Sequence, residues 1–319
     1  QDIHFTQFQN SPLSINPAYS GCFDGNIRFV ANHRSQWNSI SVPFTTSQFS
    51  FDSRLFEDRL KGDALGAGLQ VMNDRAGAGH LSNFSVMLDA SYIRNFGALK
   101  ENTICFGIQS GFFQKRVDFT KLTFANQYVD GSFNTGIPSG ENESNNSASN
   151  IDVSFGLLYQ LQKSNGFNMH SGLAVFHLTK PNESIIGGTS PLPQRLALYY
   201  GLVIPLDNIT SLSPEILYMK QNKAQELLIT TKVERIFTTE NDKRIYVSLG
   251  SGFRASDAIV FLTGLGFDKW KLYFSYDINI SQLRPATNYR GGYEISIIFT
   301  DKIFPGKNKI PVGVPCIRL

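Results

Sequence analysis

The stretch WKLYFSYDINI at residues 270–280 decides how this chain folds, because its side chains alternate in character at every step. Large apolar residues occupy the even positions from Trp270 onward, and more polar residues, among them Lys271 and Asp277, occupy most odd positions. The stretch YEISIIF at 293–299 is similar, with Glu294 on its polar face. Successive side chains of a β-strand point to opposite faces. Both stretches therefore predict strands with one apolar and one polar face.

The same alternation recurs along the whole chain of 319 residues and predicts about 14 strands of roughly 9–11 residues, the length of a tilted transmembrane strand. No apolar run approaches the ~20 residues that a membrane helix needs, which excludes a helical membrane protein. The net charge of +3 is too small to indicate binding of nucleic acid. The remaining fold classes are a soluble all-β sandwich or propeller and a transmembrane antiparallel β-barrel.

The connections between the predicted strands favour the membrane barrel, because their lengths differ by side. Short turns on one side and long loops on the other are typical of outer-membrane barrels with both termini in the periplasm, and a soluble sandwich has no reason to show them. The predicted short connections are 56–62, 97–101, 163–166, 205–208, 238–242 and 268–269, and the long ones are 35–44, 73–82, 118–149, 179–193 and 281–290.

Charged residues on the polar faces should point into the lumen of such a barrel. Inward charges are tolerated only if they are paired or hydrated, so we expect a lumen that holds water, a plug or salt bridges. His170 and His177, seven residues apart, should lie on opposite faces of one strand. The predicted lumen-facing charges are Arg28, Asp52, Asp89, Asp152, Glu215, Lys271, Asp277 and Glu294.

The motifs of common enzymes are missing from the sequence. The histidines do not have the spacing of a metal-binding helix, and the glycines at 77–79 lack the rest of a phosphate-binding loop. The chain also lacks the Gly-x-Ser-x-Gly elbow of serine hydrolases. We therefore expect a protein that is not an enzyme and that needs no metal or cofactor.

The chain divides into an N-terminal segment (residues 1–24), a barrel (25–300) and a C-terminal tail (301–319). The N-terminal segment is irregular but apolar, which predicts a plug in or near the lumen. The tail should be extended and periplasmic, because prolines cannot continue a sheet. Apolar and basic residues in the tail could dock on a partner, and the alternative is a disordered end. The docking residues we expect are Phe304, Pro305, Pro311, Pro315 and Arg318.

The cysteines allow one possible disulfide bond. Cys22 and Cys316 lie outside the predicted strands and near termini on the same, oxidising side, so they could pair. Cys105 lies inside a predicted strand and should stay a thiol. The alternative is that Cys22 and Cys316 also remain thiols.

The opening of the chain resembles that of mature PorP/SprF proteins of the Bacteroidetes. The resemblance rests on FTQF at 5–8, NPAYSG at 16–21, RSQW at 34–37, PFTT at 43–46 and FD at 51–52, and near the end on SYDIN at 275–279 and GGYEI at 291–295. The residues of this chain that belong to the predicted plug and to the family motif are Phe5, Gln7, Phe8, Asn16, Pro17, Ala18 and Trp37.

This resemblance implies an outer-membrane barrel of the type IX secretion and gliding motility system. It further implies partners among the periplasmic lipoprotein ring of the secretion machinery, or the C-terminal domain of a large cell-surface adhesin whose secretion or anchoring the barrel supports. Because residue 1 is Gln, we also expect export with a cleaved signal peptide. The alternative function is a channel for small solutes, similar to fatty-acid transporters.

Overall fold

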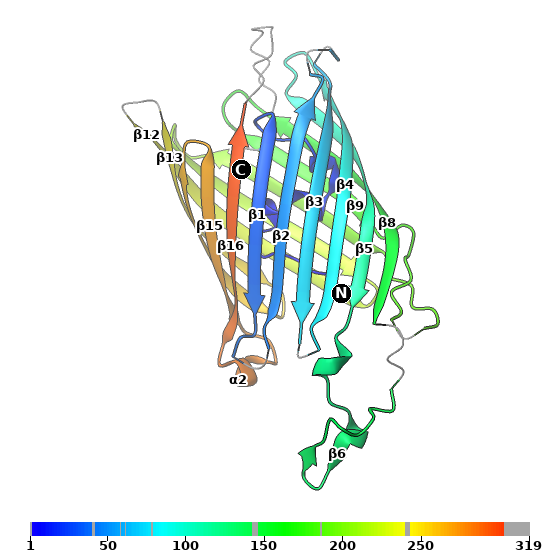
Figure 1. The fold of residues 1–319 in the computed structure, drawn as a ribbon. Helices are drawn as coiled ribbons and strands as arrows, with labels where there is room; N and C mark the ends of the chain where they lie inside the picture. The colour runs from blue at the N-terminus through cyan, green and yellow to red at the C-terminus, as the bar shows by residue number, and fades with distance from the viewer. Residues whose placement is uncertain are drawn as a thin grey trace.

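The protein forms a closed barrel of antiparallel strands (Figure 1). A computed structural model describes residues 2–39, 42–57, 59–60, 62–77, 79–141, 146–185, 187–239 and 243–302. Each strand pairs with its neighbours in sequence, except that β5 pairs with β8 across an insertion, and β1 pairs with β16 to close the sheet. The strand order contains 14 members, which confirms the predicted all-β transmembrane barrel.

The barrel strands are nine to sixteen residues long. Their bounds are β1 (Ile27–Gln36), β2 (Phe44–Leu55), β3 (Ala64–Ala76), β4 (Leu81–Phe96), β5 (Asn102–Arg116), β8 (Ser147–Gln162), β9 (Asn168–Phe176), β10 (Arg195–Pro205), β11 (Thr210–Gln221), β12 (Ala224–Thr238), β13 (Arg244–Arg254), β14 (Ala258–Phe267), β15 (Trp270–Asn279) and β16 (Arg290–Asp301).

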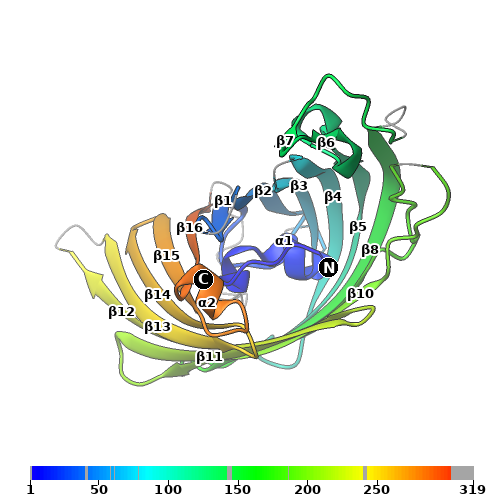
Figure 2. The same ribbon diagram turned by 90° about the horizontal axis from the view of Figure 1, so that it is seen from below.

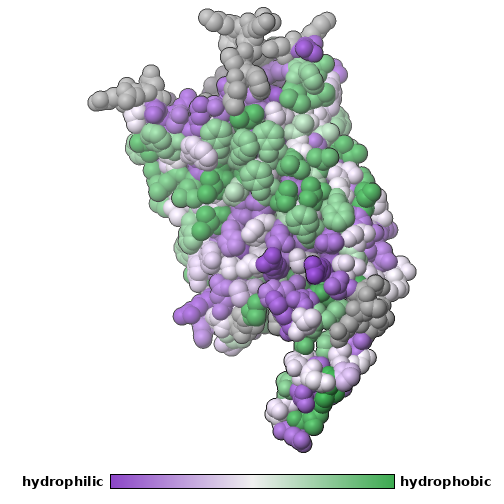
Figure 3. Space-filling view, in the orientation of Figure 1, coloured by the Kyte–Doolittle hydropathy of each residue, from purple (hydrophilic) through white to green (hydrophobic). Residues whose placement is uncertain are grey.

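The outer face of the barrel carries the apolar side chains that the alternation predicts. Phe274 and Ile295 are exposed there, whereas their neighbours Ser275 and Glu294 are buried inside. Figure 3 shows the apolar side chains as a band around one half of the barrel, with polar residues beyond it toward the other end. An apolar belt on a closed sheet suits a bilayer, because closure leaves no unpaired strand edge in lipid. Among the described residues, no helix is both long and apolar enough to span a membrane.

The two ends of the barrel differ as the loop lengths predict. One, the short-turn end, carries connections such as 97–101, 206–209 and 268–269. The other, the long-loop end, carries α2 (Arg284–Thr287) and an arm at 117–141 that includes the hairpin of β6 (Tyr128–Val129) and β7 (Ser132–Phe133) and projects from the barrel (Figure 1).

One predicted long loop is wrong. The loop expected at 73–82 is a tight turn, because β3 continues to Ala76 and β4 begins at Leu81. Residues 73–75 are all polar, so the alternation of apolar and polar residues that predicts the strand stops before them. They still pair with β4, from Asn73 with Phe84 to Ala76 with Leu81, where the strands pass beyond the apolar band.

The N-terminal segment lies inside the barrel (Figure 2), which confirms its predicted location. It forms three short turns, η1 (Phe8–Asn10), α1 (Pro12–Ile15) and η2 (Pro17–Tyr19), and it buries Phe5, Leu13 and Phe23 almost completely. The segment reaches the short-turn end, where the Asn26 amide donates to the Asp301 carbonyl. In the predicted tail, residues 303–319 lie outside the described residues.

Candidate functional site

The lumen is the candidate functional site, and its first feature is a charged cluster around Thr6. The Thr6 and Gln7 amides donate to the Glu294 carboxylate at 2.8 and 2.9 Å, and the Thr6 hydroxyl donates to Asp277 at 3.0 Å. Arg34 bonds to Glu294 and Asp277, and Arg254 bonds to Asp277. Both guanidinium groups also donate to the Thr6 hydroxyl. We call these six residues the Thr6 cluster. Buried ion pairs of this kind are costly to break.

A second ion pair holds the segment near the short-turn end. Arg28 on β1 and Asp52 on β2 form a bidentate pair at 2.9 and 2.8 Å, and Asp52 also accepts from the Gly21 amide at 2.8 Å. Arg54 donates to the carbonyls of Gly21 and Phe23 at 2.8 and 2.9 Å. Arginine suits this role because its planar group bonds several oxygens at once.

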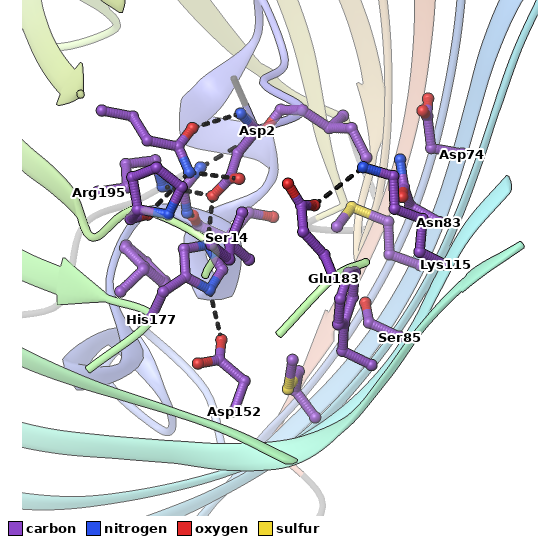
Figure 4. Close-up of a pocket in the computed structure, with 18 of the residues that line it drawn as sticks. Asp2, Ser14, Asp74, Asn83, Ser85, Lys115, Asp152, His177, Glu183 and Arg195 are labelled. Atoms are coloured by element: carbon purple, nitrogen blue, oxygen red, sulfur yellow. Dashed lines mark hydrogen bonds and ion pairs between the residues drawn. The ribbon is translucent and has the colours of Figure 1, made fainter. Parts of the chain in front are cut away.

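A third cluster holds the beginning of the segment toward the long-loop end (Figure 4). The His177 ring lies 2.6 Å from Asp2 on one side and 2.6 Å from Asp152 on the other. Arg195 adds an ion pair to Asp2 at 3.3 Å, and Gln221 donates to Asp2 at 2.8 Å. We call these five residues the Asp2 cluster.

Electrostatics make His177 a cation at neutral pH. Burial opposes the charged imidazole, but the hydrogen bonds to Asp152 and Asp2 and their negative charges raise the pKa of His177 to about 9. Burial likewise opposes the charged Asp2, yet Arg195 and His177 hold the pKa of that carboxyl well below its usual range. His177 and Asp2 are therefore both charged around neutral pH.

His177 corrects one expectation from the sequence. It was predicted on the face opposite His170, yet both rings point into the lumen, because β9 ends at Phe176 and His177 adopts a left-handed backbone with φ of 59°.

The Asn16-Pro17-Ala18 motif packs directly on the barrel wall. The Asn16 side chain accepts from the Ala18 amide at 2.8 Å and donates to the Leu157 carbonyl at 2.9 Å. The wall can come this close because it carries glycine at the contacts. An added Cβ at Gly107 would lie 2.2 Å from the Ala18 amide nitrogen, and one at Gly156 would lie 1.8 Å from the Asn16 side-chain oxygen.

Cavities lie in the lumen toward both of its ends. The cavity toward the long-loop end is about 460 Å³ and is lined by Asp2, His177 and Gln221 among others (Figure 4). The cavity toward the short-turn end is about 620 Å³ and is lined by Ser213 and Lys232 among others. The two share no lining residue.

A layer of packed side chains lies between the levels of the two cavities. On β11, Gln221 lines one cavity and Ser213 lines the other, and Glu215 lies between them in sequence. At the level of Glu215, the segment contributes Phe8, Ile15 and Tyr19. Tyr19 stacks on Tyr199 of β10 with ring centroids 5.3 Å apart. The N-terminal segment thus fills the middle of the lumen.

A comparison with known families identifies the family of this chain. Residues 1–299 match the family described as "Type IX secretion system membrane protein PorP/SprF". The chain belongs to the PorP/SprF family. The barrel fold and this family point to the outer membrane and to involvement with the type IX secretion machinery.

Solved structures are similar to this PorP/SprF barrel, and of the two described here TbuX supports the same fold. The toluene transporter TbuX of Ralstonia pickettii matches with a TM-score of 0.54 and 10% identity, over 92% of this chain and 94% of TbuX. The toluene transporter TodX of Pseudomonas putida matches with a TM-score of 0.47 and 12% identity, over 91% of this chain and 92% of TodX. A search of curated proteins gave no match.

The structure places the predicted site residues of this PorP/SprF protein as follows. The eight predicted lumen-facing charges are all inside the barrel and at most 8% exposed. Six motif residues, from Phe5 to Ala18, are buried in the N-terminal segment. Trp37 lies apart from them, beyond the end of β1 and 4.9 Å from the Phe44 ring. The tail residues Phe304, Pro305, Pro311, Pro315 and Arg318 lie outside the described residues, as does Cys316.

Among the charged residues of the Thr6 and Asp2 clusters, Asp2, Arg34, Arg195 and Arg254 were missed from the sequence. Arg34 and Arg254 could have been found, because each lies an even number of residues from a polar residue of the same strand that points inward. These residues are Arg28 on β1 and Ser248 on β13. Asp2 carries no such signal. Within the described part of the chain, no group of three His, Cys, Asp or Glu side chains has the arrangement of a metal site.

Proposed function

We propose that this protein is a non-catalytic outer-membrane barrel that acts as a binding partner in type IX secretion. Its task is to support the secretion or surface anchoring of a large adhesin of the gliding type. The observation that carries this proposal is the filled lumen, in which residues 2–24 are fixed by three charged clusters. A barrel closed in this way offers its two ends to other proteins and does not need to conduct solutes.

The energetics of the clusters support a fixed segment. Withdrawing it would leave Glu294, Asp277 and Asp52 without the Thr6, Gln7 and Gly21 donors that now bond to them. Each buried hydrogen bond to a charged group contributes roughly 1.5–3 kcal/mol. Three such sites, spread along the segment, resist its removal as a unit.

The two ends fit different partners. We assign the short-turn end to the periplasm, where the tail 301–319 would dock on the lipoprotein ring of the secretion machinery through its apolar and basic residues. We assign the long-loop end to the cell surface, where the projecting arm exposes Tyr128, Val129 and Phe133. Exposed aromatic residues of this kind are typical of binding surfaces, and the adhesin's C-terminal domain is the proposed partner.

Co-purification from native membranes tests the partner role. The full-length protein should recover secretion components and the adhesin, identified by mass. Deletion of residues 305–319 should leave the barrel inserted but lower recovery of the periplasmic components. Deletion of 130–141 in the arm is the matched control, which should instead lower recovery of the adhesin. If both deletions retain every companion at the wild-type level, the proposed docking is refuted.

The second candidate function is a channel for small solutes, and the two lumen cavities favour it. TbuX is a toluene transporter with this fold. Single-channel recording in a planar bilayer separates the two functions. A partner barrel should show no steady conductance, and a channel should conduct. Steady conductance of the wild-type protein would replace our proposal with the channel.

A further inference from the structure

The N-terminal segment and the barrel wall each contribute a cysteine at the same point of the lumen. Cys22 follows η2, and its amide donates to the Tyr19 carbonyl at 2.9 Å. Cys105 lies on β5, with its side chain pointing inward. The two Sγ atoms are 3.1 Å apart. The residues are 1% and 0% exposed, respectively.

The surroundings hold the two sulfurs against each other. Ala18, four residues before Cys22, sits over Gly107, two residues after Cys105. Two residues before Cys22, the Ser20 carbonyl accepts from Ser91 on β4 at 2.6 Å. The backbone around Cys22 is thus fixed both to β5, which carries Cys105, and to the neighbouring strand β4. A disulfide forms only where backbone positions already bring the sulfurs together, and this condition is met here.

We propose that Cys22 and Cys105 form a disulfide bond that links the N-terminal segment covalently to the barrel wall. This differs from the pairing of Cys22 with Cys316 that the sequence suggested. That expectation assumed that Cys105 stays a thiol because it lies inside a strand. The strand, however, directs the Cys105 side chain into the lumen, where Cys22 meets it.

The reaction is a thiol–disulfide exchange with a disulfide-bonded oxidant of the periplasm. One thiolate attacks the oxidant and forms a mixed disulfide, and the second thiolate then displaces the oxidant as a thiol. The two cysteines lose two protons and two electrons, which reduce the oxidant to a dithiol. Barrel proteins reach the outer membrane through the oxidising periplasm. Because the folded barrel buries both sulfurs, the exchange takes place while the segment docks on β5, before the rest of the lumen packs around it.

The bond would give the segment a permanent attachment. The charged clusters hold residues 2–24 reversibly, whereas a covalent link between positions 83 residues apart keeps the segment next to β5 even when those clusters open. The bond would also be slow to reduce in the folded protein, because no reductant reaches the buried sulfurs.

Peptide mapping of the full chain from native membranes tests the proposal directly. The protein is denatured with N-ethylmaleimide and without reductant, then digested and analysed by mass spectrometry. We expect a linked pair of peptides that contain Cys22 and Cys105, and an alkylated Cys316. Alkylated peptides for both Cys22 and Cys105, or a link between Cys22 and Cys316, would overturn the proposal.

Variants provide the controls. Cys316→Ser should keep the linked pair, and Cys105→Ser should lose it. On non-reducing electrophoresis after unfolding, the wild-type chain should migrate faster than Cys105→Ser, because the link closes a loop in the chain. The difference should vanish with reductant. Equal mobility of the two unfolded chains without reductant would count against the bond, and heat-modifiable migration of each barrel checks that it folds.

Discussion

Replacing His177 with Gln should remove a specific pH dependence from the stability of this barrel. His177 lies between Asp2 and Asp152 at 2.6 Å from each, and its side chain is 13% exposed. Gln keeps a polar side chain at the position but cannot carry the positive charge. The Asp2 cluster would then lose the cation between its two carboxylates.

The magnitude follows from the pKa of His177. The folded protein raises it from 6.5 to about 9, and at ~1.4 kcal/mol per pKa unit the difference is worth ~3 kcal/mol. A group whose pKa is raised by folding contributes fully below pH 6.5, and its contribution is lost as the pH rises through about 9. Asp2 has a lowered pKa, so it stays charged across this window.

The assay is unfolding by urea in phospholipid vesicles, with the free energy of unfolding measured at several pH values across that window. The wild type should lose ~3 kcal/mol more than His177→Gln between the two ends. The matched control is His33→Gln, at an outward-facing position of β1 where the ring contacts the Ser47 hydroxyl. It should keep the wild-type pH dependence. If His177→Gln shows the same slope as the wild type, the assigned charge on His177 is refuted.

Three further predictions concern the lumen and the lipid face. Arg34→Met should cost ~3–5 kcal/mol of unfolding free energy, because it leaves the buried Glu294 carboxylate without its cation, whereas Lys269→Met at an exposed ion pair should cost ~0–1. Gly107→Ala should displace the N-terminal segment, and bilayer recording should detect new channel openings. Unchanged closure would contradict the close packing described. Phe274→Arg on the lipid face should cost ~2–4 kcal/mol near the bilayer midplane, and Ser211→Arg beside the short-turn cavity should cost clearly less. Equal costs would refute the register.

The barrel was predictable from the sequence because strand alternation is a local signal that lipid and lumen impose at every step. The same parity placed Asp277 and Glu294 inside the barrel. It could not show that Thr6 would join them, because the N-terminal segment has no period from which its contacts can be read. His177 was misplaced because parity fails where a strand ends. The contact between Cys22 and Cys105 was missed because it depends on the three-dimensional path of an irregular segment.

The position of Thr6 bears on the order in which the molecule assembles. Arg34 on the first strand and Glu294 on the last face each other across the junction where the sheet closes, and Thr6 bonds to both. We therefore expect the N-terminal segment to act as a template for the pairing of β1 with β16 that closes the sheet. A nascent chain without it would bring these charges together with fewer of their partners, and its two outer strands would keep unpaired edges for longer. We therefore expect closure of the wall and occupation of its interior to be coupled in this protein.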